Sequence, residues 1–162
     1  MWRTRFERLA ADHPDELSET FIRQLALAQR TSGIDYQQAM FDRTILFRRV
    51  QSLLQRADAL AMPTLSRTAL PIEQELFATI EIDNEVFNEV RANWFPWTMP
   101  FNMTGHPAVS VPCGFGSDGL PIGLQLVGRF RGDAELLHLC ALFEAAQNSL
   151  DRWPHEADGG PR

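Results

Sequence analysis

The chain has 162 residues, of which 44% are hydrophobic and 22% charged, and this composition excludes collagen-like and intrinsically disordered proteins. The formal net charge is −6 and the arginines are scattered, so we expect no nucleic-acid partner. The cysteines, Cys113 and Cys140, are too few for a disulfide framework.

Lysine is absent from the sequence, since all 15 basic residues are arginine. Arginine stays protonated in proteins and cannot serve as a general base. No apolar run approaches the roughly 20 residues that span a bilayer, and the first residues lack a signal-peptide pattern. We therefore expect a cytoplasmic protein without membrane contact, with residues 1–150 forming part of one domain and residues 151–162 a disordered tail.

The first half of the chain is predicted to be helical. A short helix around Phe6 precedes a helix over residues 13–29, in which Pro14 suits the first position. Ser32 and Asp35 form a variant capping box for a third helix, whose apolar residues recur at helical spacing from residue 36 to residue 57.

The second half mixes strands and helices. Residues 58–64 read as a short strand ending near Pro63, residues 65–83 as an irregular connection, and residues 84–94 as a helix. Two strands over residues 106–115 and 120–128 are separated by turn-forming residues, which predicts a hairpin. A last helix begins at Asp133 and ends near residue 147.

No catalytic or metal-binding site follows from the residues themselves. None of the serines lies in a Gly-x-Ser-x-Gly motif, and Ser110 is interpreted as an ordinary mid-strand residue. Cys113 reads as a small buried hydrophobe, and the histidines lack metal-ligand spacing. The glycines of residues 114–119 lie between two strands, where they predict a turn and not a phosphate site. We predict no catalytic residue, no metal and no cofactor.

Four segments taken together resemble the C-terminal part of amidase-signature enzymes. They are residues 34–50, then DALAMPT, then PFNMTGHPAVSVPCGF, then DGLPIGLQLVGR followed by AELLHLCALFEAA. The third segment carries Asn-x-x-Gly-x-Pro-Ala from Asn102, and the fourth carries Gly-Leu-Pro-x-Gly-x-Gln from Gly119. The resemblance extends over residues 36–146. It implies an α/β fold, namely the C-terminal part of an α/β/α sandwich with a mixed sheet and flanking helices.

The resemblance also implies a reaction, the hydrolysis of carboxylic amides through a serine acyl-enzyme. In that family a lysine base, a bridging serine and a nucleophilic serine in a Gly-Ser-rich stretch lie in the N-terminal half. Neither a lysine nor a Gly-Gly-Ser-Ser-Gly-Gly stretch occurs in this chain. We therefore expect the C-terminal portion of an amidase, inactive alone, with a small-molecule amide as substrate of the complete enzyme only.

Three residues are candidates for a wall of the substrate pocket: Trp97, Phe101 and Asn102. The alternatives are core packing for the aromatic residues and helix capping for Asn102. Two other functions stay open, a non-enzymatic interaction module and a subunit of a split amidase or of a tRNA-linked amidotransferase. A truncated sheet is expected to associate through its exposed edge, whereas an adapted module is expected to be monomeric.

Overall fold

A computed structural model describes residues 2–147 and divides the chain into two compact units, Met1–Arg43 and Thr44–Arg162. The predicted tail over residues 151–162 lies outside the described residues. No helix in the described part of the chain combines the length and apolarity needed to cross a membrane.

The first unit contains two short helices, α1 (Trp2–Asp12) and α2 (Glu19–Leu27). The rings of Phe6 and Phe21 meet edge to face at 5.6 Å between centroids. The single helix predicted over residues 13–29 is wrong, because Pro14 opens only a 3₁₀ turn and Leu17 is extended. The Ser18 hydroxyl then accepts a hydrogen bond from the Phe21 N–H at 3.3 Å, so α2 starts afresh at Glu19.

Helix α3 (Gly33–Leu54) begins at the predicted capping box. The Asp35 N–H donates to Ser32 Oγ at 3.1 Å, and the Ser32 N–H donates to Asp35 Oδ2 at 2.9 Å. The Ser32 hydroxyl also donates to this carboxylate, and these bonds lower the pKa of Asp35. Near the C-terminal end of α3, Leu54 is buried whereas Leu53 stays 55% exposed.

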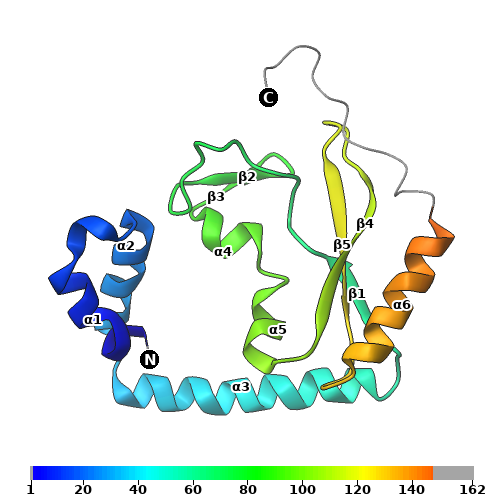
Figure 1. The fold of residues 1–162 in the computed structure, drawn as a ribbon, viewed down its shortest axis with the longest axis horizontal. Helices are drawn as coiled ribbons and strands as arrows, with labels where there is room; N and C mark the ends of the chain where they lie inside the picture. The colour runs from blue at the N-terminus through cyan, green and yellow to red at the C-terminus, as the bar shows by residue number, and fades with distance from the viewer. Residues whose placement is uncertain (1, 148–162) are drawn as a thin grey trace. The chain divides into compact units, whose positions relative to one another are not determined.

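The main sheet of the second unit is antiparallel, with the order β1–β5–β4 (Figure 1). Its strands are β1 (Leu60–Pro63), β4 (Ala108–Phe115) and β5 (Pro121–Val127). The predicted hairpin is confirmed, with Gly119 at φ 76° closing the turn between β4 and β5. Parallel strand pairs, which the mixed parent sheet would contain, do not occur among residues 2–147.

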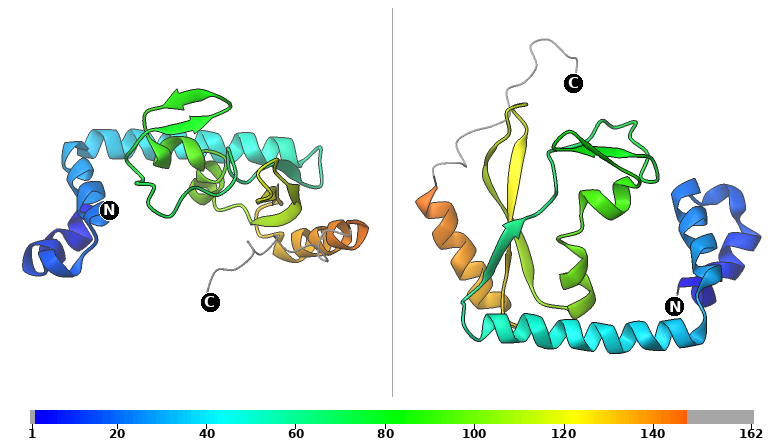
Figure 2. Two further views of the ribbon diagram at one scale, coloured as in Figure 1. Left: turned by 90° about the horizontal axis from the view of Figure 1, so that it is seen from above. Right: turned by 180° about the vertical axis from the view of Figure 1, so that it is seen from behind.

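A small hairpin replaces part of the helix predicted over residues 84–94. Strands β2 (Ile80–Ile82) and β3 (Glu85–Phe87) pair through Asp83 and Asn84, both at positive φ. This is the backbone of a type I′ hairpin turn, and Asp and Asn tolerate it better than most residues. The helical prediction is therefore wrong before α4 (Val90–Trp94), which packs near β2 (Figure 2).

Two helices of the second unit lie close to the sheet, α5 (Met99–Thr104) and α6 (Asp133–Ala146). The sequence predicted α6 but did not predict α5. Helix α5 ends at Gly105, whose φ of 72° suits a left-handed C-terminal cap and whose N–H donates to the Phe101 carbonyl.

The core lies on both faces of the sheet. Consecutive residues of a strand point to opposite faces, and Leu126 and Val127 accordingly join different clusters. Val127 packs with Val50, Leu54 and Phe101, whereas Leu126 packs with residues of β4 and α6. In Figure 1, α6 and α5 flank the strands from opposite sides, so the sheet forms the central layer of this unit.

Candidate functional site

A pocket of about 520 Å³ lies where the loop after β1 meets the start of β5. We call it the hydroxyl pocket. Its lining residues come from the loop, from the end of α4 and from strands β4 and β5: Thr64, Leu65, Ser66, Arg67, Thr68, Ala69, Trp94, Ser110, Pro121, Ile122 and Gly123. The alternation of strand residues places Ser110 and Gly123 on the sheet face opposite α6.

Two hydroxyl groups form the polar centre of the pocket. Thr64 Oγ1 and Ser110 Oγ are 2.7 Å apart, although the residues are separated by 46 positions in the sequence. The Thr64 N–H donates to the Gly123 carbonyl at 2.9 Å, which holds the loop against β5. A side chain at Gly123 would collide with both hydroxyls, because its Cβ would lie 2.6 Å from Ser110 Oγ and 2.9 Å from Thr64 Oγ1. The close approach therefore requires glycine at this position.

The loop over residues 64–69 is fixed by hydrogen bonds to the end of α4 and to the β4–β5 turn. The Ser66 N–H donates to the Trp94 carbonyl at 2.8 Å, and the Trp94 indole N–H donates back to the Arg67 carbonyl at 3.4 Å. The Thr68 hydroxyl donates to Asp118 Oδ2 in the β4–β5 turn at 2.5 Å. This bond, followed by one from the Leu120 N–H, lowers the pKa of Asp118.

The chemistry of the hydroxyl pocket favours binding over bond cleavage. Hydroxyls donate and accept hydrogen bonds, and the indole of Trp94 together with Leu65, Pro121 and Ile122 supplies apolar surface. A serine or threonine nucleophile needs an adjacent base, and the described residues that line this pocket include neither lysine nor histidine. Within residues 2–147, no three His, Cys, Asp or Glu side chains group in a way that could hold a metal ion.

Histidine 106 lies elsewhere in the second unit, enclosed by aromatic rings. The centroids of Phe47 and Phe130 lie 5.1 and 6.0 Å from its own, and its exposure is 5%. Its Nδ1 is 2.8 Å from Thr104 Oγ1, whereas Nε2 has no partner among the described residues. Burial lowers the pKa of His106, so the ring is neutral at pH 7 and serves packing.

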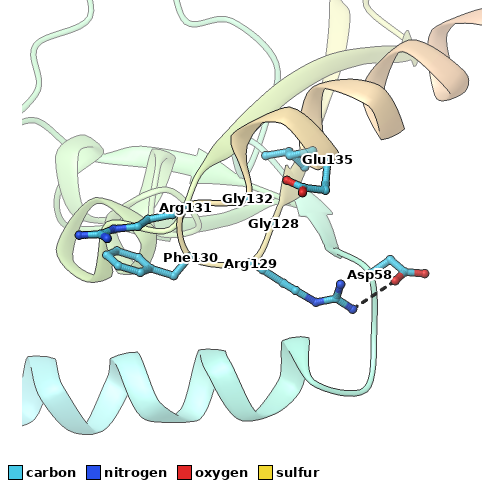
Figure 3. A pocket seen from close by; sticks show the side chains of 8 residues that line it. Asp58, Gly128, Arg129, Phe130, Arg131, Gly132 and Glu135 are labelled. Carbon is cyan, nitrogen blue, oxygen red and sulfur yellow. Dashed lines mark hydrogen bonds and ion pairs between the residues drawn. The ribbon is translucent and has the colours of Figure 1, made fainter.

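A second pocket of about 270 Å³ surrounds the turn before α6, with Arg129 beside it (Figure 3). Arg129 Nε donates to the Leu54 carbonyl at 3.1 Å, and Nη2 lies 3.2 Å from Asp58 Oδ1. A cation at the C-terminal end of a helix satisfies exposed carbonyls and complements the helix dipole. We assign Arg129 a structural duty, the capping of α3.

Comparison with known proteins decides the family. A profile of the family described as Amidase matches residues 2–137. The chain belongs to the amidase family. This amidase-family chain is 32% identical over 142 residues to an acylamidase of Rhodococcus erythropolis, an alignment that covers 88% of the chain and 29% of the acylamidase. It is also 35% identical over 119 residues to a glutamyl-tRNA(Gln) amidotransferase subunit from Prochlorococcus marinus, an alignment that covers 74% of the chain and 23% of that relative.

Solved structures agree with this assignment. The fold matches a crystal structure of an amidase with a TM-score of 0.79 and 26% identity, over 90% of this chain and 32% of that one. The fold also matches a bacterial aryl acylamidase of the amidase-signature family, with a TM-score of 0.73 at 23% identity. The predicted family and α/β fold are therefore confirmed. The amidase-family chain spans about a third or less of the length of these relatives.

The three predicted pocket residues lie near α5 and line neither of the two pockets described above. Phe101 is buried in the core with Val127, while Trp97 is 45% exposed. The backbone carbonyl of Trp97 accepts a hydrogen bond from Nε2 of the buried Gln125 at 2.9 Å. Asn102 is exposed on α5. Their contact with a substrate stays a prediction.

Sequence reasoning missed the residues that line the hydroxyl pocket. Thr64 follows Pro63 in a motif that resembles the family, and this motif was the available signal. Ser110 was interpreted as ordinary strand patterning, since nothing in its local sequence indicates that its hydroxyl meets a threonine.

Proposed function

We propose that this chain is the C-terminal portion of an amidase, and that it supplies part of the substrate pocket while the catalytic residues belong to the remaining portion of the enzyme. The observation that carries the proposal is the hydroxyl pocket, whose described lining has hydrogen-bonding and aromatic groups but no base. An amide offers a carbonyl oxygen as acceptor and an N–H group as donor. The hydroxyl pair of Thr64 and Ser110 can donate a hydrogen bond to the carbonyl and accept one from the N–H.

The sequence motifs support the same division of labour. The segments that carry the family resemblance supply part of this lining, namely Thr64 at the end of DALAMPT, Ser110, and residues 121–123 of the Gly-Leu-Pro-x-Gly-x-Gln strand. The Ser-Ser-Lys chemistry implied by the resemblance needs a lysine, and the chain has none. A chain that forms only part of an amidase could keep the residues that bind the substrate and lack the residues that cleave it.

The first test asks whether the chain is inactive alone. The purified 162-residue chain is mixed with 4-nitroacetanilide and the release of 4-nitroaniline is followed by absorbance. We expect no turnover, because the described lining of the hydroxyl pocket includes neither a lysine nor a histidine to activate a hydroxyl. Turnover that a serine-directed inhibitor abolishes would refute this proposal.

The second test asks whether the hydroxyl pocket binds an amide. Benzamide is titrated into the ¹⁵N-labelled chain, and we expect the Gly123 amide and Trp94 indole signals to shift together. Thr64→Val keeps the shape of the side chain and removes the hydroxyl, so binding should weaken roughly fivefold. Thr79→Val is the matched control, since the exposed Thr79 lies outside the pocket. Equal affinity of the two variants would contradict the role of Thr64.

A specific observation also favours association with another polypeptide. Helix α6 is apolar on its outer side, where Leu137 and Leu142 are 59% and 55% exposed, and β4 and β1 are the outer strands of the described sheet. A subunit of a split amidase would use such a face. When that partner is absent, the exposed face should associate with a second copy of the chain. Light scattering should then give a mass above the 18.4 kDa of one chain, and replacing Leu137 and Leu142 with glutamate should restore the monomer. A wild-type chain that stays monomeric at every concentration would count against this candidate.

A further inference from the structure

Arg67 is the only charged residue among the described residues that line the hydroxyl pocket. Its Nη1 donates to the Glu81 carbonyl at 2.8 Å, which anchors one end of the guanidinium. Among residues 2–147 it forms no salt bridge. A guanidinium has five N–H donors in a planar fork that matches a carboxylate, so an anchored Arg67 keeps donors for a ligand.

The carboxylate of Asp118 is close to Arg67 but does not form a salt bridge with it. Asp118 lies in the β4–β5 turn and is not part of the pocket lining. Its Oδ2 accepts the Thr68 hydroxyl, and its Oδ1 accepts the Leu120 N–H at 3.1 Å. Arg67 has the smallest of the effects that lower the pKa of Asp118, so the two charges interact only weakly. Arg67 is therefore left without an ion-pair partner among the described residues.

The other lining residues indicate which further chemical groups a ligand of this pocket would carry. The Trp94 indole N–H donates to the Arg67 carbonyl, which places the aromatic ring beside the backbone of Arg67 in the pocket lining. The Thr64–Ser110 hydroxyl pair lies at the sheet side, against Gly123. A ligand that uses all three features has an apolar body, an amide and an anionic group.

We propose that the hydroxyl pocket selects amides that carry a carboxylate, with Arg67 binding the carboxylate and the Thr64–Ser110 pair binding the amide. This selectivity rests on the proposed function, in which the same pocket holds the amide substrate. Arg67 is then a specificity-determining residue, and its charge acts on the affinity for acidic amides alone.

The test compares two probes of closely similar shape, one of which carries a negative charge. N-Benzoylglycine carries a carboxylate, and N-benzoylglycinamide is its neutral primary amide. Both are titrated into the complete 162-residue chain, with the Gly123 amide and Trp94 indole signals as readouts. We expect the wild-type chain to bind the acid about tenfold more tightly than the neutral amide, as for one charge-assisted hydrogen-bonded pair. Added salt should reduce this ratio.

Variants separate charge recognition from pocket formation. Arg67→Gln should bring the ratio close to one, because it weakens the binding of the acid. Arg56→Gln removes the same charge from an exposed residue outside the pocket and should leave the ratio near ten. Binding of both probes with equal affinity to wild type, or a ratio that Arg67→Gln does not change, would overturn the selectivity and leave the amide pocket intact. Absence of binding for both probes would overturn the amide pocket as well.

Discussion

Replacing Gly123 with alanine places a methyl group where the two hydroxyls of the pocket now meet. The new Cβ would lie 2.6 Å from Ser110 Oγ and 2.9 Å from Thr64 Oγ1, and Thr64 Cβ would be 3.3 Å away. Both oxygens are bonded directly to a Cβ atom, so neither can withdraw as the end of a long side chain could. The strand or the loop after β1 must move.

The expected loss in the free energy of unfolding is the sum of two destabilising effects and one stabilising effect. Overpacking of this kind costs about 1–3 kcal/mol, and loss of the 2.7 Å hydrogen bond adds about 1 kcal/mol. The reduced freedom of alanine in the unfolded chain returns about 0.4–1 kcal/mol. The net loss is about 2 kcal/mol, which at a urea dependence of about 2 kcal/mol per molar lowers the unfolding midpoint by about 1 M.

Urea unfolding followed by circular dichroism measures this loss, and two further variants test its cause. Gly33→Ala is the matched control, since a Cβ at the start of α3 meets nothing within 4 Å and should cause no loss. Combining Gly123→Ala with Ser110→Ala removes the closest atom and should recover part of the stability. If Gly123→Ala were as stable as wild type, or if Ser110→Ala brought no recovery, the steric argument would be wrong.

Two other predictions concern His106 and Arg129. Burial lowers the pKa of His106, so the unfolded chain binds its proton more readily and the free energy of unfolding should fall as the pH drops below about 6.5. Urea midpoints at about pH 7.5 and 5.5 should show this fall, and His106→Leu should reduce it. An equal fall in His106→Leu would assign the effect to other groups. Arg129→Gln should lower the stability by about 1 kcal/mol through the lost cap on the Leu54 carbonyl, whereas Asp58→Asn should cost under about 0.5 kcal/mol because the pair is exposed. Equal losses in thermal unfolding would assign the contribution of Arg129 to the ion pair instead.

Elements with a strong local signal agreed with their sequence predictions. The Ser32–Asp35 capping box, the β4–β5 hairpin and α6 all depend on residues close together in the chain. Errors arose where two local signals competed. Around Pro14, the cap at Ser18 starts a new helix, and at Asp83 and Asn84 a two-residue turn prevails over a helical spacing of apolar residues. Helix α5 was missed, because prolines and aromatic residues conceal its short span.

The candidate site depended on longer-range structure. No pattern around Ser110 indicates a partner 46 residues away, because that contact requires β5 to lie between β1 and β4 in a particular register. The same sheet places Gly123 under both hydroxyls. Trp97 and Phe101 were chosen because they lie in an aromatic segment beside the family motif at Asn102, and burial of Phe101 in the core could be seen only once α5 was placed against the sheet.

The sequence by itself determined the family, through short motifs at fixed spacing, and it determined that this chain lacks the lysine on which that family's chemistry depends. Both properties are readable from residue identities alone. Only the tertiary structure decided which residues share a pocket, why Gly123 must be glycine, and that Arg67 is the single charge in the described lining. The physical reason is that strand order and register bring together atoms that are distant in the chain, and local sequence carries no measure of that distance.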